Sequence, residues 1–215
     1  MFDAVFDTAR EQVSICAVGS EGIPASPSAH VFAVCVTADG VPIVGVRRTS
    51  FAYQAITAQR KKAQVTPVSR SLLKYMYFNE IKEIWIRLVN AEACGHFVAF
   101  SGGKFEELVM LGGSPAKHET AHECLVREVG EESDYRLSVI GFGADALKIT
   151  IYDKILDKKY TGYCMLCFVA ETSRDIEGVQ LYNIEVRSIC SLEKKKENEK
   201  YPYLTYIYNT LTPTK

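Results

Sequence analysis

Short apolar runs and longer periodic segments alternate along the chain. The short runs are rich in β-branched and aromatic residues, which favour strands. They cover residues 30–37, 42–47, 107–111, 147–152, 160–171 and 181–189. Asp39 and Gly40 lie between the first two runs, and an Asp-Gly pair is typical of a tight hairpin turn. The pattern therefore predicts six strands, with the first two in a hairpin.

Three other segments predict helices. In residues 71–90, apolar side chains recur at steps of three and four, which places them on one helix face. A second helix is predicted to open at Ser114 as the N-cap, with Pro115 at the first helical position. An aromatic helix is predicted at 204–211. Strands interleaved with helices favour one α/β or α+β domain, with a helical insertion at residues 56–90.

The composition is that of an ordinary globular protein. Of the 215 residues, 47% are apolar and 24% are charged, which argues against a disordered or low-complexity chain. No apolar run approaches about 18 residues and the first residues show no signal peptide, so we expect neither a membrane span nor secretion. The 25 basic and 26 acidic residues give a net charge of −1, which argues against a uniformly basic nucleic-acid binder.

The seven cysteines are odd in number and scattered through apolar stretches, as is typical of reduced thiols inside a cell. Cys164 and Cys167 form a CxxC pattern, which in some proteins binds a metal or carries redox chemistry. Their β-branched and aromatic neighbours favour a buried strand instead. We therefore expect both side chains in the core.

Charge is unevenly distributed along the chain. Residues 56–90 carry seven basic and two acidic side chains, a local charge of +5, together with four aromatic residues. Such a segment can bind an RNA backbone, but the same pattern fits an amphipathic helix with aromatic residues in the core. Residues 105–134 carry eight acidic and two basic side chains, a local charge of −6. The nearly neutral sum therefore does not exclude a nucleic-acid substrate.

The acidic segment contains a spaced motif. Residues 113–135 read GSPAKHETAHECLVREVGEESDY, which resembles the Nudix box: glycine, five residues, Glu, seven residues, then Arg-Glu-aliphatic-x-Glu-Glu. The matching residues are Gly113, Glu119, Arg127, Glu128, Val129, Glu131 and Glu132. The family pattern then expects a glycine where this chain has Asp134, in the turn that follows the helix.

Three of these glutamates are predicted to share one patch of a helix. Glu128 lies one turn from both Glu131 and Glu132, where like charges cost roughly a few tenths of a kcal/mol per pair. A divalent cation would reverse that cost, and Mg²⁺ and Mn²⁺ prefer carboxylate oxygens. The alternative is a solvated acidic helix face, but the box spacing and the Gly112-Gly113 entry favour a metal site.

A second pattern overlaps the box. His118 to His122 read HETAH, which also satisfies the HExxH signature of zinc proteases. Its longer form needs glycine and histidine where the chain has Leu125 and Glu128. We therefore expect both histidines to face solvent in the first turns of the helix, without zinc.

Beyond the box, the chain is similar nearly end to end to the poxvirus mRNA-decapping Nudix proteins, particularly the shorter of the two paralogous types. The segments that carry this resemblance are 47–56, 105–113, 161–168 and 203–209. It implies a single Nudix domain over residues 1–215, an α/β/α sandwich with a mixed sheet. It also implies hydrolysis of capped mRNA to 7-methyl-GDP and 5′-monophosphate RNA, in the cytoplasm of an infected host cell. No membrane and no obligate protein partner are expected.

The resemblance also implies roles for acidic residues. Glu128, Glu131 and Glu132 would hold Mg²⁺ or Mn²⁺, and Glu185 matches a fourth acid used for metal binding or as a general base. The candidate catalytic residues are Glu131, Glu132 and Glu185, and the choice between Glu132 and Glu185 as the base stays open. The residues expected to support the box are Gly113, Glu119 and Arg127, with Arg127 pairing to Glu119.

Cap binding makes separate demands. N7-methylated guanine is cationic and favours a slot between two aromatic faces, and its N–H donors suit carboxylate acceptors. The resemblance assigns the aromatic pair to Phe51 and Tyr160 and the acids to Glu11 and Asp153. Tyr53, two residues from Phe51 on the same face of an expected strand, is the rival aromatic.

Two other functions stay open. One is a Nudix pyrophosphatase for free nucleotides, such as nucleoside diphosphate sugars or dinucleoside polyphosphates. The other is a cap-binding protein without turnover, although a pure binder has no need for three crowded carboxylates.

Overall fold

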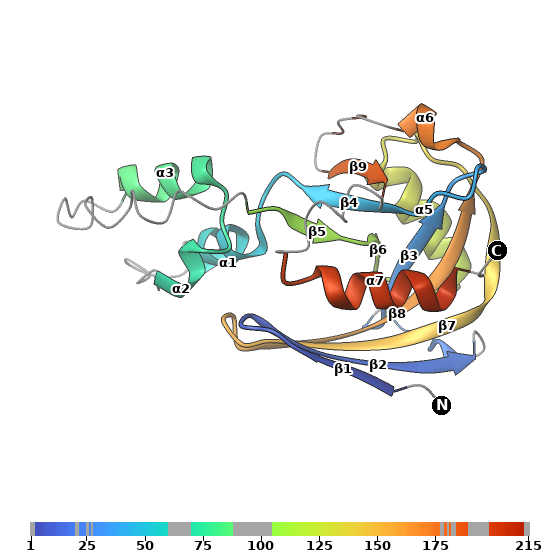
Figure 1. The fold of residues 1–215 in the computed structure, drawn as a ribbon, viewed down its shortest axis with the longest axis horizontal. Helices are drawn as coiled ribbons and strands as arrows, with labels where there is room; N and C mark the ends of the chain where they lie inside the picture. The colour runs from blue at the N-terminus through green and yellow to red at the C-terminus, as the bar shows by residue number, and fades with distance from the viewer. Residues whose placement is uncertain are drawn as a thin grey trace. The chain divides into compact units, whose positions relative to one another are not determined.

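The computed structural model describes most of the chain and divides it into two compact units (Figure 1). The described residues are 3–19, 22–24, 26, 28–59, 70–87, 105–176, 179, 181, 184–188 and 198–212. The first unit comprises Met1–Val46 and Leu108–Lys215, and the second comprises Arg47–Glu107. The helical insertion predicted at residues 56–90 lies within the second unit.

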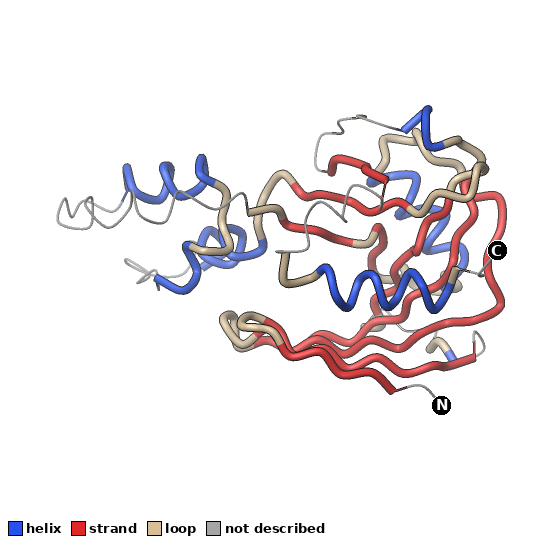
Figure 2. Tube along the Cα trace, viewed as in Figure 1, coloured by secondary structure: helices blue, strands red, loops and turns tan. Residues whose placement is uncertain are grey.

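The first unit is built on a mixed six-stranded sheet, drawn in red in Figure 2. Its strands, in spatial order, are β1 (Asp3–Asp7), β2 (Glu11–Gly19), β7 (Val139–Asp153), β8 (Lys158–Val169), β3 (His30–Val36) and β6 (Leu111–Gly113). Strands β3 and β8 pair in parallel, and the other neighbours pair antiparallel. The mixed sheet predicted from the family resemblance is confirmed.

Helices cover both faces of this sheet. Alternate residues of a strand point to opposite faces, and β3 divides accordingly. Its Val31, Ala33 and Cys35 share a buried cluster with helix α5 (Ala121–Glu132), whereas Val34 and Val36 share one with α7 (Tyr201–Leu211). The expected α/β/α sandwich is therefore confirmed. Helix α5, which carries the acidic motif, forms one of the two helical layers.

The CxxC pattern lies on strand β8, with its two thiols on opposite faces. Cys164 belongs to the buried cluster on the α7 side and Cys167 to the cluster on the α5 side. Burial raises the pKa of Cys164 to about 12 and that of Cys167 well above its usual value. An odd spacing along a strand separates the two sulfurs, so the prediction of two core cysteines is confirmed.

A second, three-stranded sheet changes two strand predictions. It orders β5 (Glu107–Val109), β4 (Ile43–Arg47) and β9 (Ile184–Ser188). The predicted turn at Asp39-Gly40 is present, with Gly40 at φ +80° and the Thr37 N–H donating to the Val41 carbonyl at 3.0 Å. However, β3 and β4 separate into different sheets after an isolated bridge between Val36 and Pro42.

The single strand predicted at 107–111 was also wrong. Met110 separates β5 from β6, and these two strands belong to different sheets. A continuous apolar run cannot distinguish one strand from two strands joined by a bend, because every residue is buried or half-buried either way.

In the described ranges of the second unit, 47–59, 70–87 and 105–107, three segments are helical. They are α1 (Phe51–Gln59), α2 (Arg70–Leu73) and α3 (Phe78–Arg87). The prediction of one helix over 71–90 was wrong, because a turn interrupts it before α3. The Tyr77 N–H donates to the Glu80 carboxylate at 2.9 Å, which caps α3 at the break. None of the helices in the described ranges is long and apolar enough to cross a membrane.

Candidate metal and active site

Two glycines of strand β6 bring it close to strand β3 and helix α5. A Cβ at Gly112, where φ is +148°, would overlap the carbonyl oxygen of Val31. A Cβ at Gly113 would overlap the carboxylate of Glu128. Glycine at both positions therefore allows β6 to pair with β3 and leaves a space that the Glu128 carboxylate fills.

Helix α5 begins at Ala121, not at Ser114 as predicted. Thr120 is the N-cap: its hydroxyl accepts from the Glu123 N–H at 3.2 Å, and the Glu123 carboxylate accepts from the Thr120 N–H at 2.8 Å. Ser114 instead shares a hydrogen bond of 3.1 Å with His30 Nδ1. The reciprocal capping box at Thr120 satisfies two helix-end donors, which explains the later start.

Arg127 joins the loop before α5 to the acids on α5. Its Nε and Nη2 donate to the two carboxylate oxygens of Glu119, each at 2.9 Å. Its Nη1 donates to Glu128 at 2.7 Å and to Glu131 at 3.1 Å, and Nη2 also reaches the Ser114 carbonyl at 3.3 Å. The pairing expected between Arg127 and Glu119 is present as a bidentate ion pair.

The electrostatics of this pair fix its charge. Hydrogen bonds from Arg127, and then the Ala116 N–H, lower the pKa of Glu119 to about 2. Hydrogen bonds to Glu119 and Glu128 raise the pKa of Arg127 further above its already high value. Both groups therefore stay ionised at neutral pH, and Glu119 holds the loop against the helix.

The remaining box acids lie along the same edge. Glu132 accepts the Gly112 N–H at 2.8 Å, and the Glu128 carboxylate packs on Gly113. Glu131 is exposed. The oxygen donors suit a hard divalent cation, although within the described residues no group of three His, Cys, Asp or Glu side chains is already arranged to hold a metal ion. Glu185 lies in β9, and its side chain is outside the part described.

The overlapping HExxH pattern does not form a helical zinc site. His118 lies before α5 with a left-handed backbone, φ +71°, so the expectation that both histidines lie in the helix was wrong. His122 does lie in the first turn, and its ring packs on Phe142 with 4.4 Å between centroids. Both residues are exposed, as expected.

The departure from the box at Asp134 is explained by backbone conformation. Asp134 has φ +49° and Tyr135 has φ +57°, the left-handed region that favours glycine. Aspartate tolerates this region better than most residues. The turn after α5 therefore keeps its shape without the glycine that the family pattern expects there.

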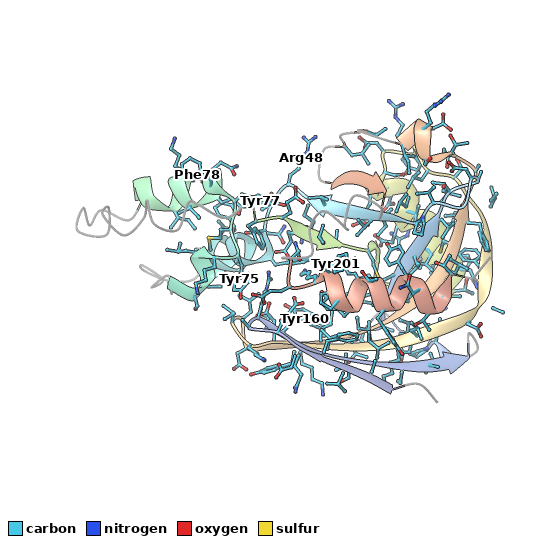
Figure 3. All side chains as sticks on the ribbon, in the orientation of Figure 1. Arg48, Tyr75, Tyr77, Phe78, Tyr160 and Tyr201 are labelled. Carbon is cyan, nitrogen blue, oxygen red and sulfur yellow. The ribbon has the colours of Figure 1, made fainter. Side chains whose placement is uncertain are left out.

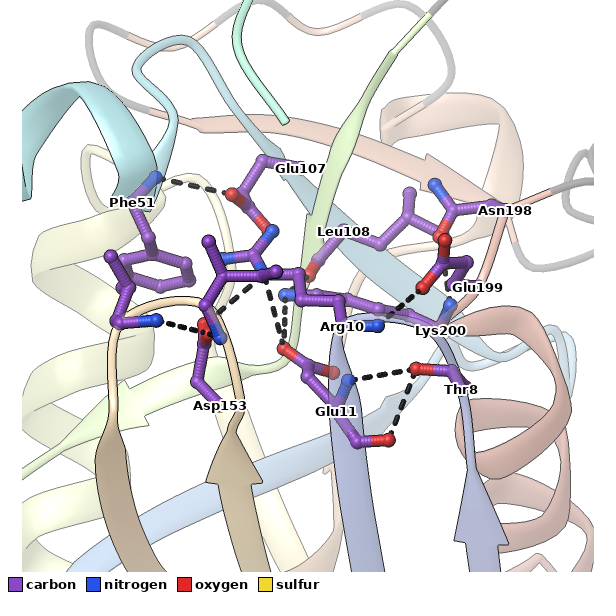
Figure 4. A network of polar contacts seen from close by, with 12 residues as sticks. Thr8, Arg10, Glu11, Phe51, Glu107, Leu108, Asp153, Asn198, Glu199 and Lys200 are labelled. Atoms are coloured by element: carbon purple, nitrogen blue, oxygen red, sulfur yellow. Dashed lines mark hydrogen bonds and ion pairs between the residues drawn. The ribbon is translucent and has the colours of Figure 1, made fainter. Parts of the chain in front are cut away.

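A second acidic group lies at one end of the six-stranded sheet (Figure 4). Glu11 of β2 and Asp153 of β7 are paired across the sheet and are 6% and 2% exposed. Arg10 Nε donates to Asp153 at 3.1 Å and lies 3.8 Å from Glu11. Asp153 also accepts two backbone N–H groups of the following turn, and Glu11 accepts the Tyr203 hydroxyl at 2.9 Å.

Tyr160 belongs to the same neighbourhood. Its side chain is 41% exposed on β8 (Figure 3), and burial, followed by the charge of Asp153, raises its pKa. The structure thus brings together three of the four predicted cap-binding residues, Glu11, Asp153 and Tyr160. Sequence analysis missed Arg10, which is buried between the two acids and carries no motif that would mark it.

Phe51 belongs to the second unit. It is the first residue of α1 and half-buried, and the Arg47 guanidinium lies 4.2 Å from its ring centroid. Residues two apart on a helix point about 200° apart. The expectation that Phe51 and Tyr53 share one face of a strand was therefore wrong, and only one of them can line a given slot.

The mixed sheet with helices on both faces, and an acidic helix α5 beside the glycine pair, fit the class of Nudix hydrolases. No family model matches the chain. The vaccinia virus mRNA-decapping protein OPG121 is 44% identical over 213 residues, covering 99% of this chain and 97% of that protein. A fowlpox virus protein, described as putative Nudix hydrolase FPV054, is 44% identical over 207 residues, covering 96% and 87%. The chain belongs to the poxvirus mRNA-decapping family of Nudix hydrolases.

Among solved structures, the Bacillus subtilis pyrophosphohydrolase BsRppH is similar with a TM-score of 0.37 and 12% identity. The match covers 79% of this chain and 66% of that protein.

Proposed function

We propose that this protein removes the 7-methylguanosine cap of mRNA by metal-dependent hydrolysis. Water adds to phosphorus and loses a proton, and the bond that breaks leaves two phosphates on 7-methylguanosine and one on the RNA. The observation that carries the proposal is the edge where Glu128 and Glu132 meet the glycines of β6, with Arg127 tied to Glu119. The vaccinia virus relative, which is 44% identical, is named an mRNA-decapping protein, in agreement with this proposal.

We assign the metal to the acids of α5, with Mg²⁺ or Mn²⁺ as the ion. Glu128, Glu131 and Glu132 would hold it, together with Glu185. The donor set fits a hard cation, because all four ligands offer oxygen and Gly113 leaves room for the Glu128 carboxylate. Once bound, the ion supplies positive charge for the phosphates and acidifies a bound water.

The chain's own residues would handle the proton and orient the site. Glu132 or Glu185 would take the proton of the attacking water. Arg127, which holds Glu119 and Glu128, keeps the loop and helix in register while substrate binds. Water attack needs this fixed geometry, because small displacements of catalytic groups cost much of the rate.

Cap recognition would use Tyr160 and Phe51 as aromatic faces and Glu11 and Asp153 as acceptors. Tyr160 is exposed enough to stack on a base. Glu11 has one carboxylate oxygen whose closest charged partners, Arg10 and Lys200, lie 3.8 Å away, beyond hydrogen-bond distance. That oxygen has capacity for a guanine N–H donor.

The RNA body would follow the second unit. Among the aromatic residues of the second unit, Tyr75 is buried and its ring contacts Phe105. Phe78 on α3, labelled in Figure 3, is 51% exposed. The Lys82 ammonium lies 5.3 Å from the Phe78 ring centroid. An exposed ring beside a cation suits a stacked base and its phosphate. The cytoplasm of the infected host cell, where mRNA is translated, is the setting that this substrate implies.

The experiment is to incubate the protein with RNA labelled in its cap, with Mg²⁺, with Mn²⁺ and with a chelator. Release of 7-methyl-GDP that the chelator stops is the expected result. Turnover of free nucleoside diphosphate sugars or dinucleoside polyphosphates without RNA cleavage would replace the proposal with a nucleotide pyrophosphatase. Tight cap binding without any product would replace it with a cap-binding protein.

A further inference from the structure

The start of helix α1 is held by buried polar side chains of the second unit. The Ser50 N–H and hydroxyl each donate to the Glu80 carboxylate at 2.7 Å, one to each oxygen. The next N–H, of Phe51, donates to Glu107 at 3.1 Å (Figure 4). Ser50, Glu80 and Glu107 are 0%, 4% and 0% exposed. The backbone that carries the Phe51 ring is therefore fixed by two buried carboxylates.

Glu80 joins two helices through one carboxylate. It is the third residue of α3 and also accepts the Tyr77 N–H at 2.9 Å, so the same group caps α3 and holds the residue before α1. The Tyr77 hydroxyl donates to the Arg47 carbonyl and accepts the Glu107 N–H. The segment from Arg47 to Phe51 is therefore attached at both ends to the same small network.

Joining two helices through buried carboxylates carries an unfavourable free energy of desolvation. Burial raises the pKa of Glu80, opposed by hydrogen bonds from Ser50 and Tyr77, and the charge of Glu107 raises it further. Buried carboxylates that repel one another stabilise a fold poorly compared with apolar packing. Their value lies in geometry, because each oxygen accepts a defined backbone or hydroxyl donor.

The Phe51 ring, which this network positions, also has the Arg47 guanidinium over one of its faces. The Arg47 guanidinium lies 4.2 Å from the Phe51 centroid, and Arg47 is anchored through its carbonyl by Tyr77. Stacking on a cationic base depends steeply on ring position, since offset and tilt both weaken it. A small shift of α1 would therefore reduce the preference for a charged base.

We propose that Glu80, acting through Ser50, is a positioning residue that sets the Phe51 ring for the methylated guanine of the cap. The proposal rests on the proposed role of Phe51 in cap binding. Glu80 touches no substrate. Its contribution is to discriminate methylated from unmethylated guanine.

Glu80→Gln tests this with little change in shape. An amide has one acceptor oxygen, so its NH₂ group must face either the Ser50 N–H or the Tyr77 N–H, and one buried donor loses its partner. We expect the Kd for 7-methyl-GTP to rise about tenfold and that for GTP less than about threefold. The KM for capped RNA should rise similarly, with kcat at saturation within about twofold.

Ser50→Ala is the second variant, because it keeps the Glu80 charge and removes the hydroxyl that donates to Glu80 and accepts the Tyr53 N–H at 3.0 Å. It should lower the ratio of the two affinities in the same direction, and the double variant should lose less than the sum of the singles. Glu83→Gln, on the same helix, is the matched control and should keep the wild-type ratio. Thermal unfolding of each variant checks that the fold is intact.

The Phe51→Ala variant distinguishes the positioning role of Glu80 from the cap-binding role of Phe51, on which it rests. If Phe51→Ala keeps wild-type affinity for 7-methyl-GTP, the role of Phe51 is overturned and the positioning role falls with it. If Phe51→Ala loses affinity while folded Glu80→Gln and Ser50→Ala keep the wild-type ratio, only the positioning role is overturned. Equal losses for both nucleotides, with a lower melting temperature, would make Glu80 a purely structural residue and overturn it as well. Should Glu80→Gln fail to fold, the ratio measured for Ser50→Ala decides.

Discussion

The first unit holds two groups of acidic residues that differ in charge balance and in exposure. On the α5 side, Arg127 pairs with three glutamates, whose side chains are 13%, 17% and 49% exposed for Glu119, Glu128 and Glu131. At the end of β2 and β7, two bases, Arg10 and Lys200, lie among three acids, Glu11, Asp153 and Glu199. Arg10, Glu11, Asp153 and Lys200 are each less than 9% exposed. A partly exposed group with one base for three acids can accept a metal ion, whereas the buried group has more counter-charge for each acid. Charge balance therefore separates the proposed metal site from the buried network.

The largest difference should come from Glu132→Gln. Losing one carboxylate from the α5 set should reduce kcat for cap release by about 100-fold or more, since even groups that only support metal ligands cost about 10- to 100-fold. Stability should change little, because the residue is only half-buried. Initial rates of 7-methyl-GDP release give the measurement. Glu123→Gln is the control, since glutamine preserves the capping box; more than about a tenth of wild-type activity in Glu132→Gln would refute the assignment.

Asp153→Asn should affect the fold in a way that Glu132→Gln does not. It removes the charge paired with buried Arg10, and breaking a buried pair costs about 3 kcal/mol of unfolding free energy. Urea unfolding followed by fluorescence measures this. The matched control is Asp157→Asn in the same hairpin turn, where the exposed carboxylate accepts the Tyr152 hydroxyl at 2.9 Å. Equal stability of the two variants would remove the distinction between the acidic groups.

Gly113→Ala tests the contact between β6 and Glu128. The added methyl group would overlap the Glu128 carboxylate, and relieving the crowding should cost about 1–3 kcal/mol. Affinity for Mn²⁺, followed by titration calorimetry, should fall about tenfold as Glu128 moves. Gly19→Ala, where a Cβ meets nothing within 4 Å, is the control. Unchanged Mn²⁺ binding in Gly113→Ala would place Glu128 outside the metal set.

The smallest effect concerns pH. Arg127 lowers the pKa of Glu119 to about 2 from an ordinary value of 4.5, so the folded state favours the ionised form. The pair therefore contributes its full share to the free energy of unfolding above about pH 4.5. This contribution decreases as the pH falls toward 2 and is absent below that. The unfolding free energies of wild type and Glu119→Gln should converge over this range. A constant difference down to pH 2 would contradict the ion pair.

The sequence predicted the central strands and the acidic helix because both carry local periodicity. Residues 147–152 and 160–171 lie within or largely within β7 and β8, and the Glu128, Glu131 and Glu132 spacing lies on α5 as expected. The start of α5 was misplaced because Ser114 and Thr120 both suit an N-cap, and only Thr120 has a glutamate three residues later. The spacing of Thr120 and Glu123 is therefore a local sequence signal for the true start of α5.

Other features had no readable local signal. The roles of Arg10, Glu80 and Glu107 depend on partners 30 to 143 positions away in the chain, which no single window of sequence contains. No local pattern in residues 30–47 shows that β3 and β4 belong to different sheets. Strand β2 is different, because its residues are alternately buried and exposed from Glu11 to Ile15. The alternation of Val13 and Ile15 with polar neighbours could have predicted this strand.

The parallel pairing of β3 with β8 sets an order for folding during synthesis. His30 pairs with Gly162, 132 positions later, and β2 pairs with β7 over a similar separation. The N-terminal third of the chain therefore leaves the ribosome long before its partners exist, and its strand edges stay open until then. Such distant pairings form slowly, because loop closure precedes the contacts that reward it. The centre of the sheet can close only after β8 has been made, so a chain truncated before residue 169 should aggregate rather than fold.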